Sequence, residues 1–285
     1  MKRFVPLLCL IFATLTRFSP LALAQGGPPF RSDDPATPGN RNWEINTVFM
    51  GDRNPAEGSY VTPNVDINYG LGNRIQLKYE VPLSLHEVRD SSGHLAAGLG
   101  NSLLGVKWRF YSHHPRTAEP DETGRRESNF AVSIYPQLML SNPTGSVRRD
   151  VVEPGPQFLL PLEAKASLGP LCISAEFGYW FTKKDVPNSW IRGVIVGHEF
   201  RKKTGLYLEL YDQAATRATV SEPKTRETTL GVGFRTPLAK NGSVWFLGMA
   251  GRSLVTVTRT NGQPSWIASV GLQIVTSHKR RRSLD

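Results

Sequence analysis

The sequence predicts an all-β protein, a single closed antiparallel transmembrane β-barrel of about twelve strands. Apolar and polar residues alternate with a period of two along many segments, as they do in strands with two different faces. Short and long connections alternate between these segments. No segment after residue 24 approaches the roughly 18 uninterrupted apolar residues of a membrane-spanning helix. A closed barrel is the other structure that satisfies every backbone polar group in lipid.

The segment 73–82 shows the alternation most clearly. One face carries Ile75, Leu77, Tyr79 and Val81, and the other carries Arg74, Gln76, Lys78 and Glu80. In a soluble β-sandwich the apolar face would point to a dry core. In a membrane barrel the apolar face meets lipid and the charged face lines a wet lumen.

The predicted strands are longer than the usual soluble strand and match the roughly 9–11 residues that a tilted strand needs to cross a bilayer. They lie at 42–50, 60–69, 73–82, 100–112, 128–141, 156–167, 170–182, 189–201, 205–214, 226–236, 243–256 and 265–276.

The connections favour the membrane barrel. Short turns are expected at 70–73, 168–170, 201–204 and 238–242, and longer loops at 51–59, 83–99, 142–155, 182–188, 215–225 and 257–264. Every long loop follows an odd-numbered strand, which is the pattern of a barrel with both termini in the periplasm and long loops outside. Residues 113–127 break the pattern. Either these residues form an extended periplasmic turn, or one of the predicted strands is wrong.

Composition agrees with this fold. The chain has 285 residues, and its hydrophobic share of 39% suits strands that need apolar residues on one face only. The formal charge is +10, and part of it lies in the tail 278–282. A basic tail can indicate nucleic-acid binding, but an exported protein rarely meets nucleic acid, so a solvated end or a contact with anionic lipid is the better interpretation. Only Cys172 follows the predicted cleavage site, which excludes an internal disulfide.

The first residues have the features of a secretory signal. Lys2 and Arg3 precede an apolar stretch, and Ala22-Leu23-Ala24 is a cleavage motif. The predicted organisation is a signal peptide at 1–24, an irregular periplasmic lead-in at 25–41, the barrel at 42–276 and a basic tail at 277–285. Barrels of this class commonly end on an aromatic residue, and this tail departs from that rule.

Several stretches resemble a known family. They are the lead-in 28–35 followed by Trp43-Glu44-Ile45-Asn46, the turn at Asn68-Tyr69-Gly70, the stretch Gly98–Phe110, Pro136-Gln137-Leu138 and Gly155–Phe158. They are similar to outer-membrane proteins assigned to the meta-pathway of phenol degradation. The resemblance covers most of the chain after the signal. It implies a porin-like barrel that passes small, aromatic or otherwise hydrophobic compounds, and it brings no catalytic residues.

Motifs for enzyme chemistry are incomplete. Gly100 and Gly105 have phosphate-loop spacing, but Val106 stands where the lysine is required. His86 lacks the second histidine of a zinc-protease helix, and no serine lies two residues from His198 to form a nucleophile pair. The sequence therefore predicts no enzyme activity, no cofactor and no metal site.

The candidate functional residues are the polar and aromatic side chains expected on the inner face. They could select solutes or pair with one another and fill the lumen, and the sequence leaves both alternatives open. They are Lys78, Glu80, Lys107, Arg109, Tyr135, Glu163, Lys165, Glu176, Tyr207, Glu209, Tyr211 and Arg235.

The expected function is passive uptake of small, aromatic or hydrophobic compounds across the outer membrane of a Gram-negative-type bacterium. The loop 83–99 or 142–155 is expected to fold inward as a constriction. The alternatives are a structural or adhesive barrel with a plugged lumen, a lipid-modifying outer-membrane enzyme and a soluble periplasmic β-sandwich. The expected partners are outer-membrane lipid and lipopolysaccharide, the barrel assembly machinery and an unidentified solute, and no nucleic acid.

Overall fold

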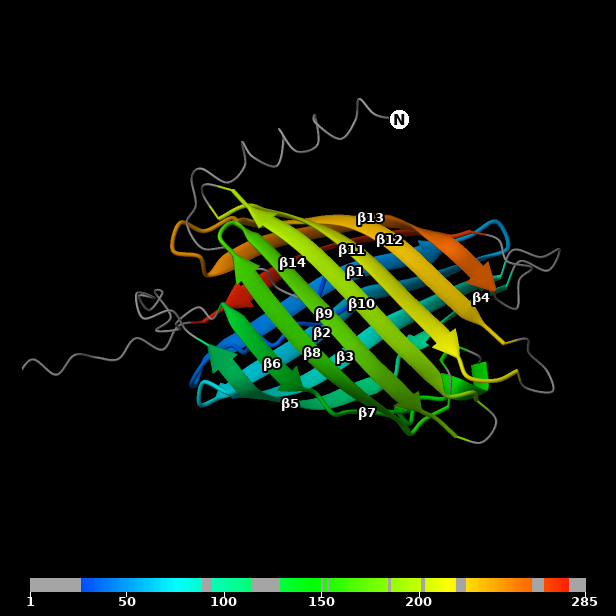
Figure 1. Ribbon diagram of the computed structural model, residues 1–285. Coiled ribbons are helices and arrows are strands. Elements are labelled where there is room, and N and C mark those ends of the chain that lie inside the picture. Colours follow the sequence, from blue (N-terminus) through cyan, green and yellow to red (C-terminus); the bar gives the residue numbers. More distant parts are fainter. Residues whose placement is uncertain are drawn as a thin grey trace, which may run out of the picture.

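One antiparallel sheet closes on itself to form a barrel in the computed structural model (Figure 1). The structure describes residues 27–88, 94–113, 129–149, 151–152, 154–183, 186–200, 203–218, 224–257 and 264–276. The predicted signal peptide and basic tail lie outside these residues. Within them the strands are β1 (Trp43–Arg53), β2 (Glu57–Leu71), β3 (Ile75–Val88), β4 (His94–Leu99), β5 (Ser102–His113), β6 (Phe130–Ile134), β7 (Gln137–Leu140), β8 (Gln157–Leu168), β9 (Leu171–Phe181), β10 (Ser189–Glu199), β11 (Gly205–Ala215), β12 (Arg226–Pro237), β13 (Val244–Val257) and β14 (Trp266–Val275).

The strands occupy twelve positions in the wall. β4 and β5 both pair with β3, and β6 and β7 both lie between β5 and β8. β6 and β7 thus share one position in the wall, and β4 pairs with the part of β3 that extends beyond β5. β1 pairs with β14 from Glu44↔Val275 to Arg53↔Trp266, which closes the barrel. The predicted fold class, a closed antiparallel barrel of about twelve strands, is confirmed.

The gap between β6 and β7 falls at Tyr135 and Pro136. Proline has no N–H group to give to a neighbouring strand, so it interrupts the ladder. Its carbonyl still accepts from the N–H of Val106 at 3.0 Å, and the N–H of Tyr135 donates to the carbonyl of Pro161 at 3.1 Å. The wall therefore stays continuous through the interruption.

Two predicted long loops are wrong. β1 and β2 extend through most of 51–59, and β3 extends to Val88 and pairs with β4. The stretch 83–99 is therefore largely a hairpin, because pairing supplies partners for its backbone N–H and C=O groups. The described part of 142–155 includes a short 3₁₀ helix, Val147–Arg149. Arg149 of this helix and the preceding Ser146 lie against β4, since a Cβ atom added at Gly98 would lie 2.8 Å from Arg149 Nη2 and 2.6 Å from Ser146 Oγ. Residues 114–128, which hold the connection that breaks the pattern, lie outside the described residues.

The short turns lie at one end of the barrel, together with the start of β1 and the end of β14. Three of them use a glycine with positive φ, namely Gly72 (66°), Gly169 (63°) and Gly242 (68°). A side chain at these positions would be strained. The N–H of Thr276 donates to the carbonyl of Trp43 at 2.9 Å, which joins the two ends of the wall beside these turns.

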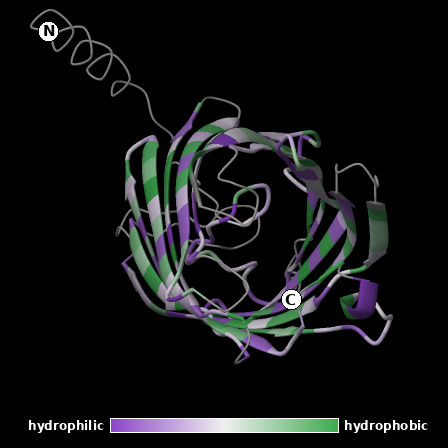
Figure 2. Cartoon of the chain, turned by 90° about the vertical axis from the view of Figure 1, so that its right-hand side faces the viewer, coloured by the Kyte–Doolittle hydropathy of each residue, from purple (hydrophilic) through white to green (hydrophobic). Residues whose placement is uncertain are grey.

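Side chains alternate between an apolar outer face and a polar inner face. On β11, Leu206, Leu208 and Leu210 are 45–48% exposed, whereas Glu209 between them is 1% exposed. Figure 2 shows the same alternation as stripes of opposite hydropathy along the strands. The polarity is the reverse of that in a soluble sandwich, so the alternative of a soluble periplasmic β-sandwich is wrong. Among the described residues, no helix is long and apolar enough to cross a membrane.

Candidate functional site

The twelve candidate residues lie on the inner face of the wall. None of them is exposed: eight are buried, and Lys78, Glu80, Arg109 and Lys165 are half-buried. They do not surround an empty space, because a second part of the chain lies among them. This part is Gly27–Asn42, called here the N-terminal segment.

The N-terminal segment enters the barrel at the end with the short turns. The N–H of Arg41 donates to the carbonyl of Gly70 at 2.8 Å, and Thr37 Oγ1 donates to the carbonyl of Asn73 at 3.2 Å. Farther in, Ser32 and Asp34 are each 1% exposed. The segment contacts strands on opposite sides of the barrel, so it crosses the interior.

Wall glutamates hold the backbone of this segment. The N–H groups of Arg31 and Ser32 donate to Glu209 Oε1 at 3.0 and 2.8 Å. The N–H of Asp33 donates to Glu176 Oε2 at 3.2 Å. These hydrogen bonds fix the backbone of three consecutive residues.

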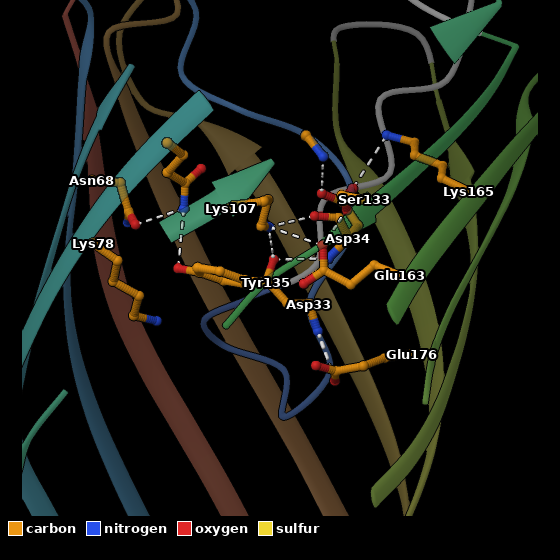
Figure 3. A network of polar contacts seen from close by, with 12 residues as sticks. Asp33, Asp34, Asn68, Lys78, Lys107, Ser133, Tyr135, Glu163, Lys165 and Glu176 are labelled. Atoms are coloured by element: carbon orange, nitrogen blue, oxygen red, sulfur yellow. Dashed lines mark hydrogen bonds and ion pairs between the residues drawn. The ribbon is translucent and has the colours of Figure 1, made fainter. Parts of the chain in front are cut away.

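Wall lysines hold the acidic side chains of the segment (Figure 3). Lys107 Nζ lies 2.9 Å from Asp33 Oδ1 and 3.4 Å from Glu163 Oε2, and it donates to the carbonyl of Asp34. Lys165 Nζ lies 3.3 Å from Asp34 Oδ2. The fully buried charge of Lys107 thus depends on one carboxylate from the wall and one from the segment.

Two further contacts complete the lysine environment. Lys107 Nζ lies 4.5 Å from the centre of the Tyr135 ring, where an ammonium group is attracted to the aromatic face. Ser133 Oγ donates to Glu163 Oε2 at 2.6 Å. Both contacts join wall residues only, so they position Lys107 and Glu163 without help from the N-terminal segment.

Arg31 of the segment pairs with acidic side chains of the wall. Its guanidinium lies 3.0 Å from Glu227 and 3.7 Å from Asp52, and 5.4 Å from the centre of the Tyr211 ring. Burial would lower the pKa of Arg31, but attraction to Glu227 and its other acidic neighbours outweighs burial and raises the pKa above its ordinary value. The arginine therefore stays charged and ties the segment to β1 and β12.

Phe30 belongs to one of two buried apolar clusters among the described residues, the other being Leu159, Ile191 and Tyr211. Its ring meets that of Tyr207 edge to face, with centroids 5.5 Å apart. The other members come from four different strands of the wall, namely Cys172, Ile195, Met249 and Ile267. The cluster is a place in the interior that already accepts an aromatic ring.

Three wall glycines leave room for the segment. A Cβ atom at Gly193 would lie 1.9 Å from Ser32 Oγ, and one at Gly233 would lie 2.5 Å from the Phe30 ring. A Cβ atom at Gly70 would lie 1.8 Å from the carbonyl oxygen of Gly39. Real Cβ atoms do not approach other atoms this closely, so the absence of a side chain at these positions is a condition for seating the segment.

A second polar network covers β1 to β3, and Gln76 connects it to Tyr135 by donating to Asn68 at 2.7 Å and to the Tyr135 hydroxyl at 3.3 Å. Lys78 Nζ lies 3.4 Å from Asp66 and 2.8 Å from Glu80. Asn46 donates to Asp66 at 3.0 Å, and Asn64 donates to Glu80 at 2.7 Å. On this side the wall residues pair mainly with one another, as one of the two sequence-based alternatives anticipated.

The remaining candidates also have partners. Arg109 donates to the carbonyl of Asn73 in a short turn. Arg235 donates to Gln273 Oε1 at 2.8 Å and lies over the Trp245 ring. In the part of the chain that the structure describes, no group of three or more acidic, histidine or cysteine side chains is placed to hold a metal.

Phe30, Arg31, Asp33 and Asp34 are functional candidates that the sequence interpretation missed. They fall in the stretch taken as a lead-in, and their irregular pattern predicts no strand. Two adjacent acids before the first strand were the available signal, but nothing in their spacing identifies Lys107 and Lys165 as partners.

No family model matches the sequence, and no curated protein matches it. Solved structures do resemble the fold. The COG4313 outer membrane channel from Pseudomonas putida F1 matches with a TM-score of 0.65 and 12% identity, over 88% of this chain and 100% of that chain. The NanC porin matches with a TM-score of 0.52 and 6% identity, over 81% and 98%. The translocator domain of autotransporter NalP from Neisseria meningitidis matches with a TM-score of 0.52 and 7% identity, over 82% and 89%. At these identities the likeness establishes the barrel fold alone.

Proposed function

We propose that the chain is an outer-membrane channel for passive passage of small solutes, and that its own N-terminal segment closes the lumen. The observation that carries the proposal is the inverted polarity of the wall, with apolar side chains outside and charged ones around the interior. A belt of apolar side chains on the outer face suits the hydrocarbon of a bilayer. The location would be the outer membrane of a Gram-negative-type bacterium. The proposal includes no enzyme activity.

The segment has the properties of a plug. It belongs to no strand of the wall, and hydrogen bonds and ion pairs to wall side chains hold it in place. If the segment left, water or a solute could form hydrogen bonds with the wall carboxylates and ammonium groups that now hold it. Withdrawal of the segment toward the short-turn end would leave the barrel closed as a sheet and would free its interior.

The interior favours a solute with an aromatic ring. The cluster around Phe30 offers Tyr207 and four aliphatic or sulfur-containing side chains to a flat apolar group. The carboxylate of Glu209, which accepts from the N–H of Arg31, the residue after Phe30, lies beside it for a polar substituent. Small aromatic compounds, which the family resemblance also implies, therefore fit the interior better than large sugars do.

The test is single-channel recording in planar bilayers. The wild type is compared with a variant that frees the segment on both sides, Phe30→Ala/Asp33→Asn/Asp34→Asn. The proposal expects rare or small openings of the wild type and frequent discrete steps of the variant. Phe49→Ala, which removes a ring from the outer face of β1, is the matched control and should behave as the wild type. Liposome swelling with a small aromatic and a disaccharide then tests the solute class.

The filled interior also favours a second candidate, a structural or adhesive barrel that never opens. The same recordings separate the two functions. Absence of conductance from both the wild type and the variant, with both proteins folded, would support the structural barrel and reject the channel.

A further inference from the structure

Two arginines and one aspartate form a compact charged group on β10, β11 and β12. Arg226 Nε lies 2.8 Å from Asp212 Oδ1, and Arg192 Nη1 lies 3.4 Å from Asp212 Oδ2. Thr228 Oγ1 donates to the same Oδ1 at 2.6 Å. One carboxylate thus positions two guanidinium groups beside each other.

The group lies on the outer face of the barrel. Asp212 has the same parity along β11 as the exposed Leu208 and Leu210, and it stands opposite Arg192 and Thr228 in the sheet register. The side chain of Asp212 is 11% exposed, whereas those of Arg192 and Arg226 are 52% and 51% exposed. The carboxylate is covered, and the guanidinium groups face the surroundings.

The charged group lies at the end of the barrel that carries the longer loops. β10 begins at Ser189, β11 ends at Ala215 and β12 begins at Arg226, so the group lies near the connections 182–188 and 216–225. Trp190, on the outer face of β10, lies at the same end, as expected for a residue at a membrane interface. In outer-membrane barrels the longer loops face the outside of the cell, which places the group in the outer leaflet.

The charges of this group do not balance. One carboxylate offsets one of the two guanidinium groups, and each arginine uses only part of its N–H donors on Asp212. A cation on the lipid-facing side of a barrel is unfavourable unless it meets polar partners. Paired guanidinium groups offer a planar set of donors that matches a phosphate.

We propose that Arg192 and Arg226 form a binding site for a phosphate group of lipid A, the membrane anchor of lipopolysaccharide in the outer leaflet. Asp212 is the positioning residue, since it sets the spacing of the two guanidinium groups and offsets only one of their two charges. The inference rests on the outer-membrane location in the proposed function and is independent of whether the barrel conducts.

The test measures lipid binding to the full chain, refolded in detergent, by native mass spectrometry. The probes are bisphosphorylated lipid A, the same lipid with its phosphates removed, and phosphatidylglycerol. The wild type should bind lipid A about tenfold more tightly than the dephosphorylated lipid, as expected for charge-assisted hydrogen bonds. Arg192→Gln/Arg226→Gln should lose this preference.

The matched control is Lys203→Gln/Lys240→Gln, which removes two positive charges from short turns at the opposite end of the barrel and should keep the preference. Arg226→Lys retains the charge without the planar fork and should bind between the wild type and the double arginine variant. Circular dichroism verifies that each variant folds.

Equal binding of lipid A by the wild type and the double arginine variant would overturn the site. So would equal binding of lipid A and phosphatidylglycerol by the wild type, which would show general attraction to anionic lipid. Conductance recordings on the same preparations separate a failure of this site from a failure of the channel.

Discussion

Gly193 and Ser32 come closer than any side chain at position 193 would allow, since a Cβ atom there would lie 1.9 Å from Ser32 Oγ and 2.7 Å from its Cβ. Ser32 also donates its N–H to Glu209 at 2.8 Å, so the residue is fixed from the wall on two sides. The two contacts show that the wall is shaped to receive the N-terminal segment at this level of the barrel.

Gly193→Val should therefore release the segment. Overpacking a tight contact costs about 1–3 kcal/mol, which raises the open population by roughly 5-fold to 150-fold. Single-channel recording should show a matching rise in open probability. Val194→Ala is the control, because it alters the neighbouring outer-face position, which is 42% exposed, and leaves the inner face unchanged. Equal open probabilities for the wild type and Gly193→Val would contradict the role of the segment as a plug.

Lys107→Met should destabilise the barrel. Lys107 is 1% exposed, and its loss would leave Glu163 and Asp33 without their buried cation. Removing one partner of a buried ion pair costs about 3–5 kcal/mol of unfolding free energy. Urea unfolding in lipid vesicles measures the loss.

The control for this substitution is Lys240→Met, which alters an exposed turn residue and should change stability by no more than about 0.5 kcal/mol. Adding Asp33→Asn and Glu163→Gln to Lys107→Met should recover part of the loss, because the stranded carboxylates are then neutral. A Lys107→Met protein as stable as the control would mean that water already solvates the network.

Local pattern was enough to predict the wall, and it was not enough to predict what fills it. Along 205–211 apolar and polar residues alternate, and each side chain lies on the face that the alternation assigns. The segment has no such period, and its contacts join residues far apart, 177 positions for Ser32 and Glu209 and 74 for Asp33 and Lys107. Such pairs depend on the closed barrel, which brings distant strands around one interior.

The missed hairpin at 83–99 has a different cause. Residues 83–86 alternate between apolar and polar side chains, as the strand before them does, but the alternation breaks at Glu87 and Val88. The polar stretch Arg89–Gly93 made the whole region resemble a loop. The hairpin pairs Leu83–Val88 with His94–Leu99. It extends the wall beyond the length that a bilayer requires. A strand length based on membrane thickness was therefore too short here.

Glu209→Gln should loosen the segment without removing its acceptor. A neutral amide oxygen still accepts the N–H groups of Arg31 and Ser32, but charge-assisted hydrogen bonds are roughly twice as strong as neutral ones. Amide hydrogen exchange at these two residues should accelerate about tenfold, since a loss of about 1.4 kcal/mol has that effect on an opening equilibrium. Glu87→Gln, whose carboxylate meets Tyr60 on β2, should leave both exchange rates unchanged.

Leu208→Lys tests the orientation of the wall itself. Leu208 is 46% exposed near the middle of β11, and in a protein surrounded by water a lysine there would change stability by no more than about 0.5 kcal/mol. Facing lipid, the same lysine should cost about 2–4 kcal/mol, because the bilayer interior cannot solvate its charge. Urea unfolding in vesicles compares it with Leu238→Lys, which alters a 60% exposed residue in a short turn and should be tolerated. If the two lysine variants unfold with the same free energy, the outer face of β11 does not meet lipid.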